Sequence, residues 1–254
     1  MYVDLEREIT ELKEKQITLS DALKEKEAFK AWWNDFRLRF CWSSNSIEGN
    51  TLTLEETIDV IEYDEVRSGH TYSEYQEAKM LYQAILDKLS LCASDTDETW
   101  LKSVNAIITN TSPEYRTKPV YIGSVIEAIY YPPDYRDVPD LMGKYMDGKP
   151  IKEDDLLTLF NRISEDHIKF ERIHPFLDGN GRTGRILLNQ ELINNNLLPV
   201  TITNNSKYRQ SFKRYDKTKD LSLLTSLLIK CEEEAIERFN SFVTKLSTSQ
   251  EKSR

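Results

Sequence analysis

Residues 174–185 read HPFLDGNGRTGR and lie between two segments whose apolar residues recur with the period of a helix. We therefore expect a loop that opens into a helix. The glycines and Asn180 can adopt left-handed backbone conformations, which lets consecutive N–H groups turn inward and bind an anion. The helix that follows adds its own unpaired N–H groups and the positive end of its dipole. This stretch predicts a cradle for several phosphates.

Two arginines strengthen that prediction. Arg182 and Arg185 fall three residues apart in the first turn of the expected helix, so they share one face. Cations at this end oppose the helix dipole, which costs roughly 0.3–1 kcal/mol each unless an anion is present. A tight turn is the simpler interpretation of residues 178–181, but it explains neither the arginines nor His174.

An imidazole, an acid, Gly-Asn-Gly and two arginines at this spacing resemble the signature of the Fic (Fic/DOC) family, HPFx(D/E)GNGRxxR. Every constrained position of the signature is met, and the resemblance covers roughly residues 43–230. It implies an all-α fold with a short β-hairpin flap. It also implies a reaction in which a protein hydroxyl attacks the α-phosphate of ATP and expels pyrophosphate.

The resemblance also assigns roles to the loop residues. His174 would deprotonate the target hydroxyl, and Asp178 would supply the oxygen ligand for Mg²⁺. Asn180 would hold the α-phosphate, Arg182 the β-phosphate and Arg185 the γ-phosphate. The complete set expected to bind the nucleotide is Gly179, Asn180, Gly181, Arg182 and Arg185.

Gly181 bears on the reaction type. In the kinase-like branch of the superfamily that this loop resembles, a lysine takes the place of this glycine, and the nucleotide binds in the reverse orientation. Gly181 therefore favours nucleotidyl transfer over phosphorylation of the target. The chain has no Walker A lysine motif, so a P-loop mechanism is unsupported.

A second motif lies near residue 48. Gly49 is expected to end an aromatic-rich helix, which places Glu48 at the negative end of the helix dipole. Residues 44–49 match the family's inhibitory motif (S/T)xxxE(G/N) through Ser44, Glu48 and Gly49, and resemble the class with an N-terminal inhibitory helix. In the family this glutamate pairs with the second signature arginine, here Arg185, and obstructs the γ-phosphate. Without the resemblance, Glu48 is equally well an acid that water screens.

Residues 115–131 are rich in β-branched and aromatic side chains and are bounded by Gly and Pro-Pro, which predicts a hairpin. A purely structural hairpin is the simpler interpretation. Its place before the loop resembles the Fic flap, which aligns a target by strand addition, here through Val120, Tyr121 and Ile122. Residues 132–133 and 138–142 fit a linker after the flap.

The length of 254 residues and the 39% hydrophobic content predict one elaborated domain. We divide it into an N-terminal helical region (1–42), the inhibitory motif with a connecting helix (43–68), a Fic-like catalytic core (69–230), and a C-terminal helix and tail (231–254). His167 lies on the apolar face of an expected helix at 154–173, so we interpret it as a hydrogen-bonded core histidine. The tail beyond residue 247 is expected to fray.

The overall charge and the cysteines exclude several classes. A net charge of −9 argues for a soluble protein and against a nucleic-acid binder. No stretch approaches the ~20 apolar residues of a membrane helix, and the N-terminus does not resemble a signal peptide. Three widely spaced cysteines fit reduced thiols. We therefore expect a cytoplasmic protein with no membrane or nucleic-acid partner.

Together these features predict a protein adenylyltransferase (AMPylator) that uses ATP and Mg²⁺ to modify a Tyr, Ser or Thr hydroxyl of a target protein or of itself. We expect Glu48 to inhibit it. Transfer of another nucleotide stays open, as does an AMP-removing hydrolase in which Glu48 positions water. A catalytically inactive nucleotide-binding module is the alternative outside enzymes, and the intact His174 and Asp178 argue against it. A homo-oligomer also stays open.

Overall fold

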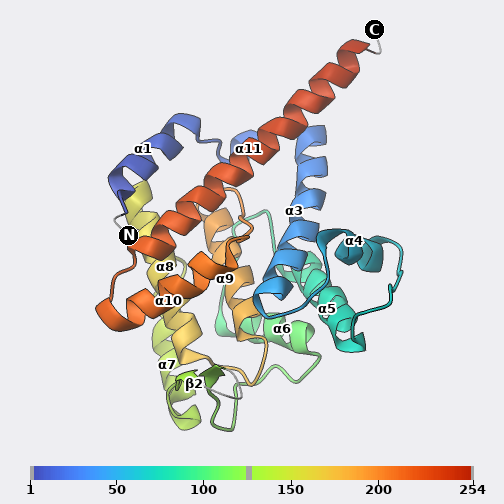
Figure 1. Cartoon of the computed structure of the whole chain (residues 1–254). Helices are drawn as coiled ribbons and strands as arrows, with labels where there is room; N and C mark the ends of the chain where they lie inside the picture. The colour runs from blue at the N-terminus through green and yellow to red at the C-terminus, as the bar shows by residue number, and fades with distance from the viewer. Residues whose placement is uncertain (1–2, 124–127, 253–254) are drawn as a thin grey trace.

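The computed structural model describes residues 3–123 and 128–252. Figure 1 shows helices packed around a common centre, with the end of α11 extending beyond the others. The elements in chain order are α1 (Leu5–Lys15), α2 (Leu19–Ala22), α3 (Lys26–Ile47), α4 (Leu54–Glu62), α5 (Tyr72–Lys88), α6 (Glu98–Thr109), β1 (Ile122–Gly123), β2 (Ala128–Tyr130), the 3₁₀ turn η1 (Tyr135–Asp137), α7 (Val138–Met146), α8 (Leu156–Ile173), α9 (Asn180–Asn194), α10 (Asn205–Thr218) and α11 (Ser222–Lys252). The expected mainly helical fold with a short strand pair is confirmed.

Helix α9 lies in the middle of the molecule and is buried on nearly every side. Its apolar residues pack into the core as expected, but its polar side chains are buried too and hold the surrounding loops. Gln190 accepts a hydrogen bond from Ser90 N at 2.9 Å, and Asn189 accepts one from Val200 N at 2.6 Å. These bonds satisfy backbone groups that burial would otherwise leave unpaired. The helix that follows the loop at residues 174–179 is therefore fixed along its length.

Helix α3 carries the aromatic stripe into the core. Trp32, Phe36 and Phe40 are all buried, and successive rings along the stripe stack on each other. The helix ends where expected, because Gly49 has a φ of +101°, a conformation that side chains with a Cβ rarely adopt. The next helix starts with the expected capping box, in which Thr53 and Glu56 bond to each other's backbone N–H groups. The end of α3 is thus held in one position.

The hairpin is shorter than predicted. Strand β1 pairs with β2 in the antiparallel sense, with Ile122 opposite Tyr130, while residues 115–121 form no strand. The reason lies with Arg116, whose buried side chain donates to backbone carbonyls around this segment, to His174 O at 2.8 Å, Lys118 O at 3.3 Å and Pro133 O at 2.5 Å. Its backbone N–H also donates to Pro175 O at 2.9 Å. Residues 124–127 of the predicted hairpin lie outside the described residues.

Two other expectations were wrong. Residues 138–142 are not a linker but the start of α7, in which Val138 and Met142 are buried and Pro139 occupies a first-turn position that needs no donor. The chain beyond residue 247 continues as α11 to Lys252 instead of fraying. The boundaries proposed at 42/43 and 230/231 fall inside α3 and α11, and one hydrophobic core includes residues from all four regions.

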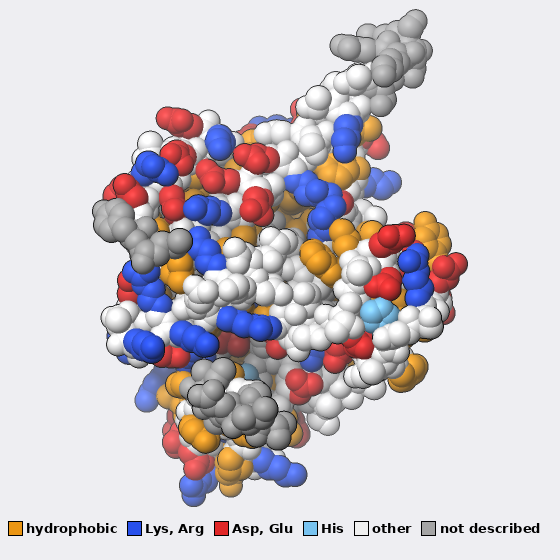
Figure 2. All heavy atoms as spheres, viewed as in Figure 1, with side chains coloured by type: hydrophobic (Ala, Val, Ile, Leu, Met, Phe, Trp, Pro, Cys, Tyr) orange, Lys and Arg blue, Asp and Glu red, His pale blue; other side chains and the backbone are white. Residues whose placement is uncertain are grey.

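The surface is charged and mixed. Figure 2 shows acidic and basic side chains interspersed over the visible face, with Lys and Arg side chains aligned over α10. Among the described residues, no helix is both long and apolar enough to span a membrane.

Helix α11 contains a carboxyl group that should make stability depend on pH. Glu232 is fully buried, and while its Oε1 accepts from Leu198 N at 3.0 Å, its Oε2 has no partner among the described residues. Burial raises the pKa of Glu232 to about 8. Because the pKa of Glu232 is higher in the folded state than in the unfolded state, the protonated carboxyl makes its full contribution to the free energy of unfolding below pH 4.5. This contribution is lost as the pH rises through 8.

We therefore expect the melting temperature of the parent protein to fall by several degrees between pH 6 and pH 9, and that of Glu232→Gln to fall less. Glu237→Gln, at an exposed position on the same helix, is the control and should follow the parent curve. Parallel curves for the parent and Glu232→Gln would contradict a charge cost at this position. Differential scanning calorimetry across the pH range makes the comparison.

Candidate active site

The loop at residues 174–179 is held by the side chain of Asn180, the first residue of α9. Asn180 Oδ1 accepts from Phe176 N and Asn180 Nδ2 donates to Phe176 O, both at 2.9 Å. Phe176 is thereby fixed with its ring buried. The amide of Asn180 was expected to hold the α-phosphate, but it is buried and both its groups are used inside the loop. Only the backbone N–H of Asn180 remains for an anion.

His174 ends α8 in a left-handed conformation, with a φ of +52°. Its Nδ1 lies 3.3 Å from Glu171 O. A carbonyl only accepts, so Nδ1 carries the proton and Nε2 is the basic nitrogen. Burial lowers the pKa of His174 to about 4, although the bond to Glu171 and the charge of Glu48 oppose the shift. We expected an ordinary value near neutrality; the imidazole is instead held neutral well below that.

The start of α9 presents groups that can bind an anion. Thr183 N donates the first helical bond, to Gly179 O at 2.9 Å, so the N–H groups of residues 180–182 precede the helical ladder. Arg182 is buried, and its Nε has no partner among the described residues. Its Nη2 lies 3.5 Å from Asp178 Oδ2, at the outer limit of a hydrogen bond. A buried cation with an unused donor suits a phosphate oxygen.

Arg185 is held by the residues of the second motif. Its Nη2 donates to Glu48 Oε1 at 2.7 Å and to Ser44 O at 2.9 Å, and its Nε donates to Ser44 Oγ at 2.8 Å. The Arg185 side chain is 2% exposed and that of Glu48 is 41% exposed. Partial burial acts to raise the pKa of Glu48, but the charge and hydrogen bond of Arg185 outweigh it and lower that pKa. The structure thus brings Ser44, Glu48 and Arg185 together, while Gly49 acts through the backbone.

The Glu48 carboxylate also covers the start of α9. A Cβ built on Gly181 would lie 2.1 Å from Glu48 Oε1, so the carboxylate would have to move aside for any larger residue. The negative charge therefore lies directly against the backbone of Gly181, where the anion site begins. The absence of a side chain at Gly181 allows this close approach.

Some of these groups meet at one cavity of about 530 Å³, which Asp178, Asn180 and Arg182 do not line. It is lined from the candidate residues by Glu48, His174, Gly181 and Arg185, and from β1 by Ile122 and Gly123. The other two residues expected in the flap, Val120 and Tyr121, do not line the cavity, and the Tyr121 side chain is half exposed. The remaining wall comes from α8 and α10, and includes Tyr208 and Phe212.

Sequence reasoning missed Glu171, one turn before His174 on α8. It lines the cavity, and its Oε1 is buried with no partner among the described residues. Burial raises the pKa of Glu171 to about 7, while the charge of Arg185 opposes the shift. Its position three residues before His174 was the only signal, and charged residues at that spacing are common. His167 is the core histidine we expected, 2.7 Å from the hydroxyl of Tyr208.

The residues fit a nucleotide-bound Mg²⁺ better than a metal held by protein alone. Within the described ranges, no three His, Cys, Asp or Glu side chains gather into a metal site. The Asp178 side chain is 77% exposed, and only Gly179 N, at 2.6 Å, bonds it closely. Magnesium usually combines one or two carboxylates with substrate phosphates and water. Asp178 beside the anion site meets that requirement.

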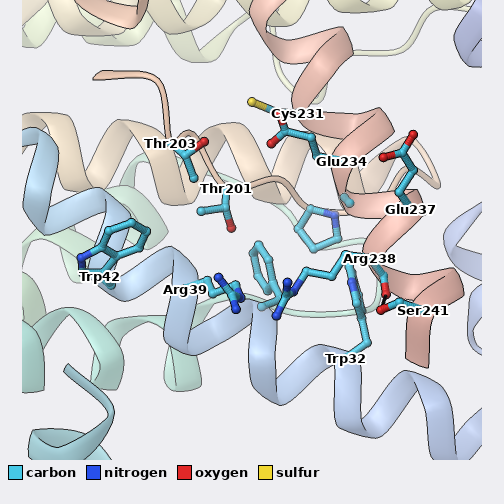
Figure 3. Close-up of a pocket in the computed structure, with 13 residues that line it drawn as sticks. Trp32, Arg39, Trp42, Thr201, Thr203, Cys231, Glu234, Glu237, Arg238 and Ser241 are labelled. Atoms are coloured by element: carbon cyan, nitrogen blue, oxygen red, sulfur yellow. Dashed lines mark hydrogen bonds between the residues drawn. The ribbon is translucent and has the colours of Figure 1, made fainter. Parts of the chain in front are cut away.

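A separate cavity of about 430 Å³ lies between α3 and α11 (Figure 3). The side chains of Arg39 and Arg238 lie side by side there, and both bond to Asp35, with Arg238 Nη2 at 2.6 Å from Oδ1. These cations already share a carboxylate, and none of the candidate residues lines the cavity. The chemistry therefore points to the cavity at the loop.

Comparison with known proteins agrees with this site. Residues 95–192 match the model of the Fic/DOC family. A protein adenylyltransferase Fic of Drosophila willistoni is 26% identical over 243 residues, which is 92% of this chain and 48% of that protein. The Drosophila virilis protein of the same name is 27% identical over 92% of this chain. The chain thus spans about half the length of the curated relatives it matches.

Solved structures share the fold. A Fic domain-containing signalling protein from Bacteroides thetaiotaomicron superposes with a TM-score of 0.75 at 21% identity, covering 94% of this chain and 97% of that one. Fic-1 of C. elegans gives 0.71 at 23% identity, covering 91% of this chain and 71% of that one. The matched segment 95–192 contains the whole loop from His174 to Arg185. Residues 95–192, which include this loop, therefore resemble a Fic/DOC domain, and the chain shares the fold of the solved Fic structures.

Proposed function

We propose that this protein is a protein adenylyltransferase that transfers AMP from ATP to a Tyr, Ser or Thr hydroxyl of a target protein or of itself. One observation carries the proposal. His174, a neutral histidine whose Nε2 is the basic nitrogen, lies next to the N-terminus of α9, and two buried arginines, Arg182 and Arg185, lie near the start of that helix. The names of the Drosophila relatives support this reaction class.

His174 would act as the general base. As the target hydroxyl oxygen bonds to the α-phosphorus of ATP, its proton passes to Nε2 and the bond to the β-phosphate bridge breaks. Pyrophosphate leaves, and AMP stays on the hydroxyl as a phosphodiester. The hydrogen bond from Nδ1 to Glu171 O fixes the ring in the tautomer that this step needs. A base of this kind contributes typically 10²–10⁴-fold.

The first turn of α9 would hold the triphosphate. The unused Nε of Arg182 and the guanidinium of Arg185 would bind the β- and γ-phosphates, beside the free backbone N–H groups of residues 180–182. Asp178 would hold Mg²⁺, which neutralises phosphate charge when bound. The base would occupy the part of the cavity lined by Ile47, Tyr208 and Phe212, whose apolar surfaces suit a flat ring.

In this proposal Glu48 is an inhibitor. It binds the arginine that the γ-phosphate needs, and its carboxylate lies against Gly181 at the anion site. Both effects act on the nucleotide and neither touches His174. A phosphate chain that shares this space with Glu48 would be misaligned for attack, and a misplacement of about 1 Å can cost 10²-fold in rate.

Labelled nucleotides test the reaction class. Purified protein is incubated with a lysate and with ATP labelled in either the α- or the γ-phosphate. Transfer of the α-label alone supports adenylylation, and transfer of the γ-label would indicate a kinase. Parallel reactions with GTP, CTP and UTP report the base preference. Release of AMP from a protein modified beforehand would favour the hydrolase, and binding without turnover the interaction module.

The flap provides a separate prediction. We propose that the segment ending in β1 aligns the target by main-chain pairing, because Tyr121 is half exposed and Ile122 lines the cavity. Tyr121→Pro removes one backbone donor, so modification of a target protein should fall about tenfold while ATP affinity stays constant. Measure labelling of a lysate protein and, separately, ATP binding by calorimetry.

Tyr121→Ala is the matched control, since it removes the same ring but keeps the N–H. Equal losses in both variants would assign the effect to the side chain. A parallel loss of ATP affinity in the proline variant would mean that the segment is part of the nucleotide pocket instead.

A further inference from the structure

A groove of about 430 Å³ lies next to the candidate active site. Its walls come from β2, α7, α8 and the end of α10, and Arg172 lines both the groove and the active-site cavity. The Arg172 guanidinium lies 4.5 Å from the ring of Tyr130 in β2 and 5.0 Å from that of Phe212 in the cavity wall. The two hollows are therefore separated by one side chain.

The groove is strongly basic for so acidic a protein. Its charged lining residues are Lys144, Lys169, Lys219, Arg172 and Asp216, which is four cations against one anion, or +3. The whole chain carries −9. Asp216 is already bound by Arg172, at 2.9 and 2.7 Å, and so it does not pair with the lysines.

The three lysines are exposed at the rim. Lys169 pairs with Glu165 at 3.0 Å, a surface pair that contributes little. The Lys219 ammonium lies 4.8 Å from the ring of Tyr215, and Lys144 is exposed. The rim thus offers cations to an incoming chain.

Beneath this rim the groove has apolar surface. Leu141, Ile168 and Ile173 line it together with the ring of Tyr215. A cationic rim over an apolar floor is complementary to an extended peptide in which carboxylates alternate with apolar or aromatic side chains. Free nucleotide would use the rim but leave the floor exposed.

We propose that this groove, which we call the lysine groove, docks an acidic segment of the target protein while the hydroxyl to be modified reaches His174 on the other side of Arg172. The inference rests on the proposed transferase function, because it names the partner of that site. The docked segment would pass β2 and then β1, so the lysine groove and the flap would hold neighbouring parts of one chain.

A direct binding experiment tests the groove without catalysis. The probe is a fluorescein-labelled twelve-residue peptide that alternates Glu with Tyr and Leu, and its partner has Lys in place of Glu. Fluorescence anisotropy should show binding of the acidic probe that weakens at least tenfold in Lys144→Glu/Lys219→Glu and in 0.5 M salt. The reversed groove should prefer the basic probe.

The matched control is Lys26→Glu/Lys30→Glu, the same charge change at exposed positions on α3 that line neither hollow. It should bind the acidic probe like the parent. Equal affinity of the parent and the reversed groove for the acidic probe would overturn the proposal. So would tighter binding of a single-stranded DNA of equal charge, which would assign the groove to nucleic acid. Lys144→Gln/Lys219→Gln serves if charge reversal impairs folding.

A second measurement separates this inference from the function on which it rests. In a Glu48→Gly background, Lys144→Glu/Lys219→Glu should label lysate proteins at least fivefold less than Glu48→Gly alone. It should hydrolyse ATP, or transfer AMP to itself, at the same rate. Loss of target labelling with retained self-transfer supports the groove. If no variant turns over ATP, the transferase proposal fails, and the probe-binding result still decides the groove.

Discussion

His174→Ala should lower AMP transfer by about 10²–10⁴-fold, the range that a general base supplies. Nε2 of His174 is the basic nitrogen at the cavity. Glu171, one turn earlier on α8, also lines the cavity, but its carboxyl group is buried, which raises its pKa to about 7. Affinity for Mg-ATP should stay within about twofold, because the α9 N–H groups and both arginines remain. Initial rates with α-labelled ATP and calorimetric binding give the two quantities.

His70→Ala is the control, since this histidine bonds to Thr51 and Glu56 away from the cavity. It should keep the parental rate. Transfer by His174→Ala within tenfold of the parent would show that another group takes the proton.

The burial of His174 also sets the pH range of activity. A base works only when it is unprotonated, and the pKa of His174 is lowered to about 4. The acid side of the kcat/KM profile, which reports the free enzyme, should therefore fall below pH 5 rather than near 6.5. An acid limb centred on pH 6.5 would mean that the ring is solvated before ATP binds.

Glu48→Gly should raise AMP transfer by at least tenfold and by up to about 10²-fold, through removal of the carboxylate that lies against Gly181 and binds Arg185. Self-modification or labelling of a lysate protein at saturating ATP measures the gain. Stabilisation of the fold by Mg-ATP should also increase if the affinity improves.

Two variants control this experiment. Glu27→Gly, at an exposed position at the other end of α3, should leave the rate unchanged. Arg185→Glu breaks the same ion pair but should not raise the rate, because it also removes the γ-phosphate contact. Equal rates for the parent and Glu48→Gly would leave Glu48 as a surface acid.

The local features of the site were predictable because short motifs at fixed spacing encode them. The loop that opens a helix and the end of α3 at Gly49 follow from residue types with local backbone preferences. The approach of Glu48 to Arg185 follows from the family resemblance. The Glu48–Arg185 contact spans 137 residues, so the two charges alone, without the resemblance, would not have predicted it.

What could not be predicted depends on contacts between distant segments. Nothing near Arg116 in the sequence indicates that its side chain binds the backbone of the loop 58 residues away and so shortens the hairpin. The lowered pKa of His174 comes from burial by several helices, and the use of the Asn180 amide comes from the loop's own turn. Periodicity and composition contain none of this information.

The proposed inhibitory motif, residues 44–49, lies at the end of a core helix rather than on a loop, and this affects how fast inhibition could be released. Helix α3 is 22 residues long and buries Trp32, Phe40 and Ser44, so its withdrawal would disrupt the packing of the core. The half-exposed Glu48 side chain can instead swing toward solvent while Arg185 keeps both its bonds to Ser44. Exposed side chains change rotamer in picoseconds to nanoseconds, whereas local unfolding takes microseconds to seconds. Release of the proposed inhibition can thus keep pace with each arriving nucleotide.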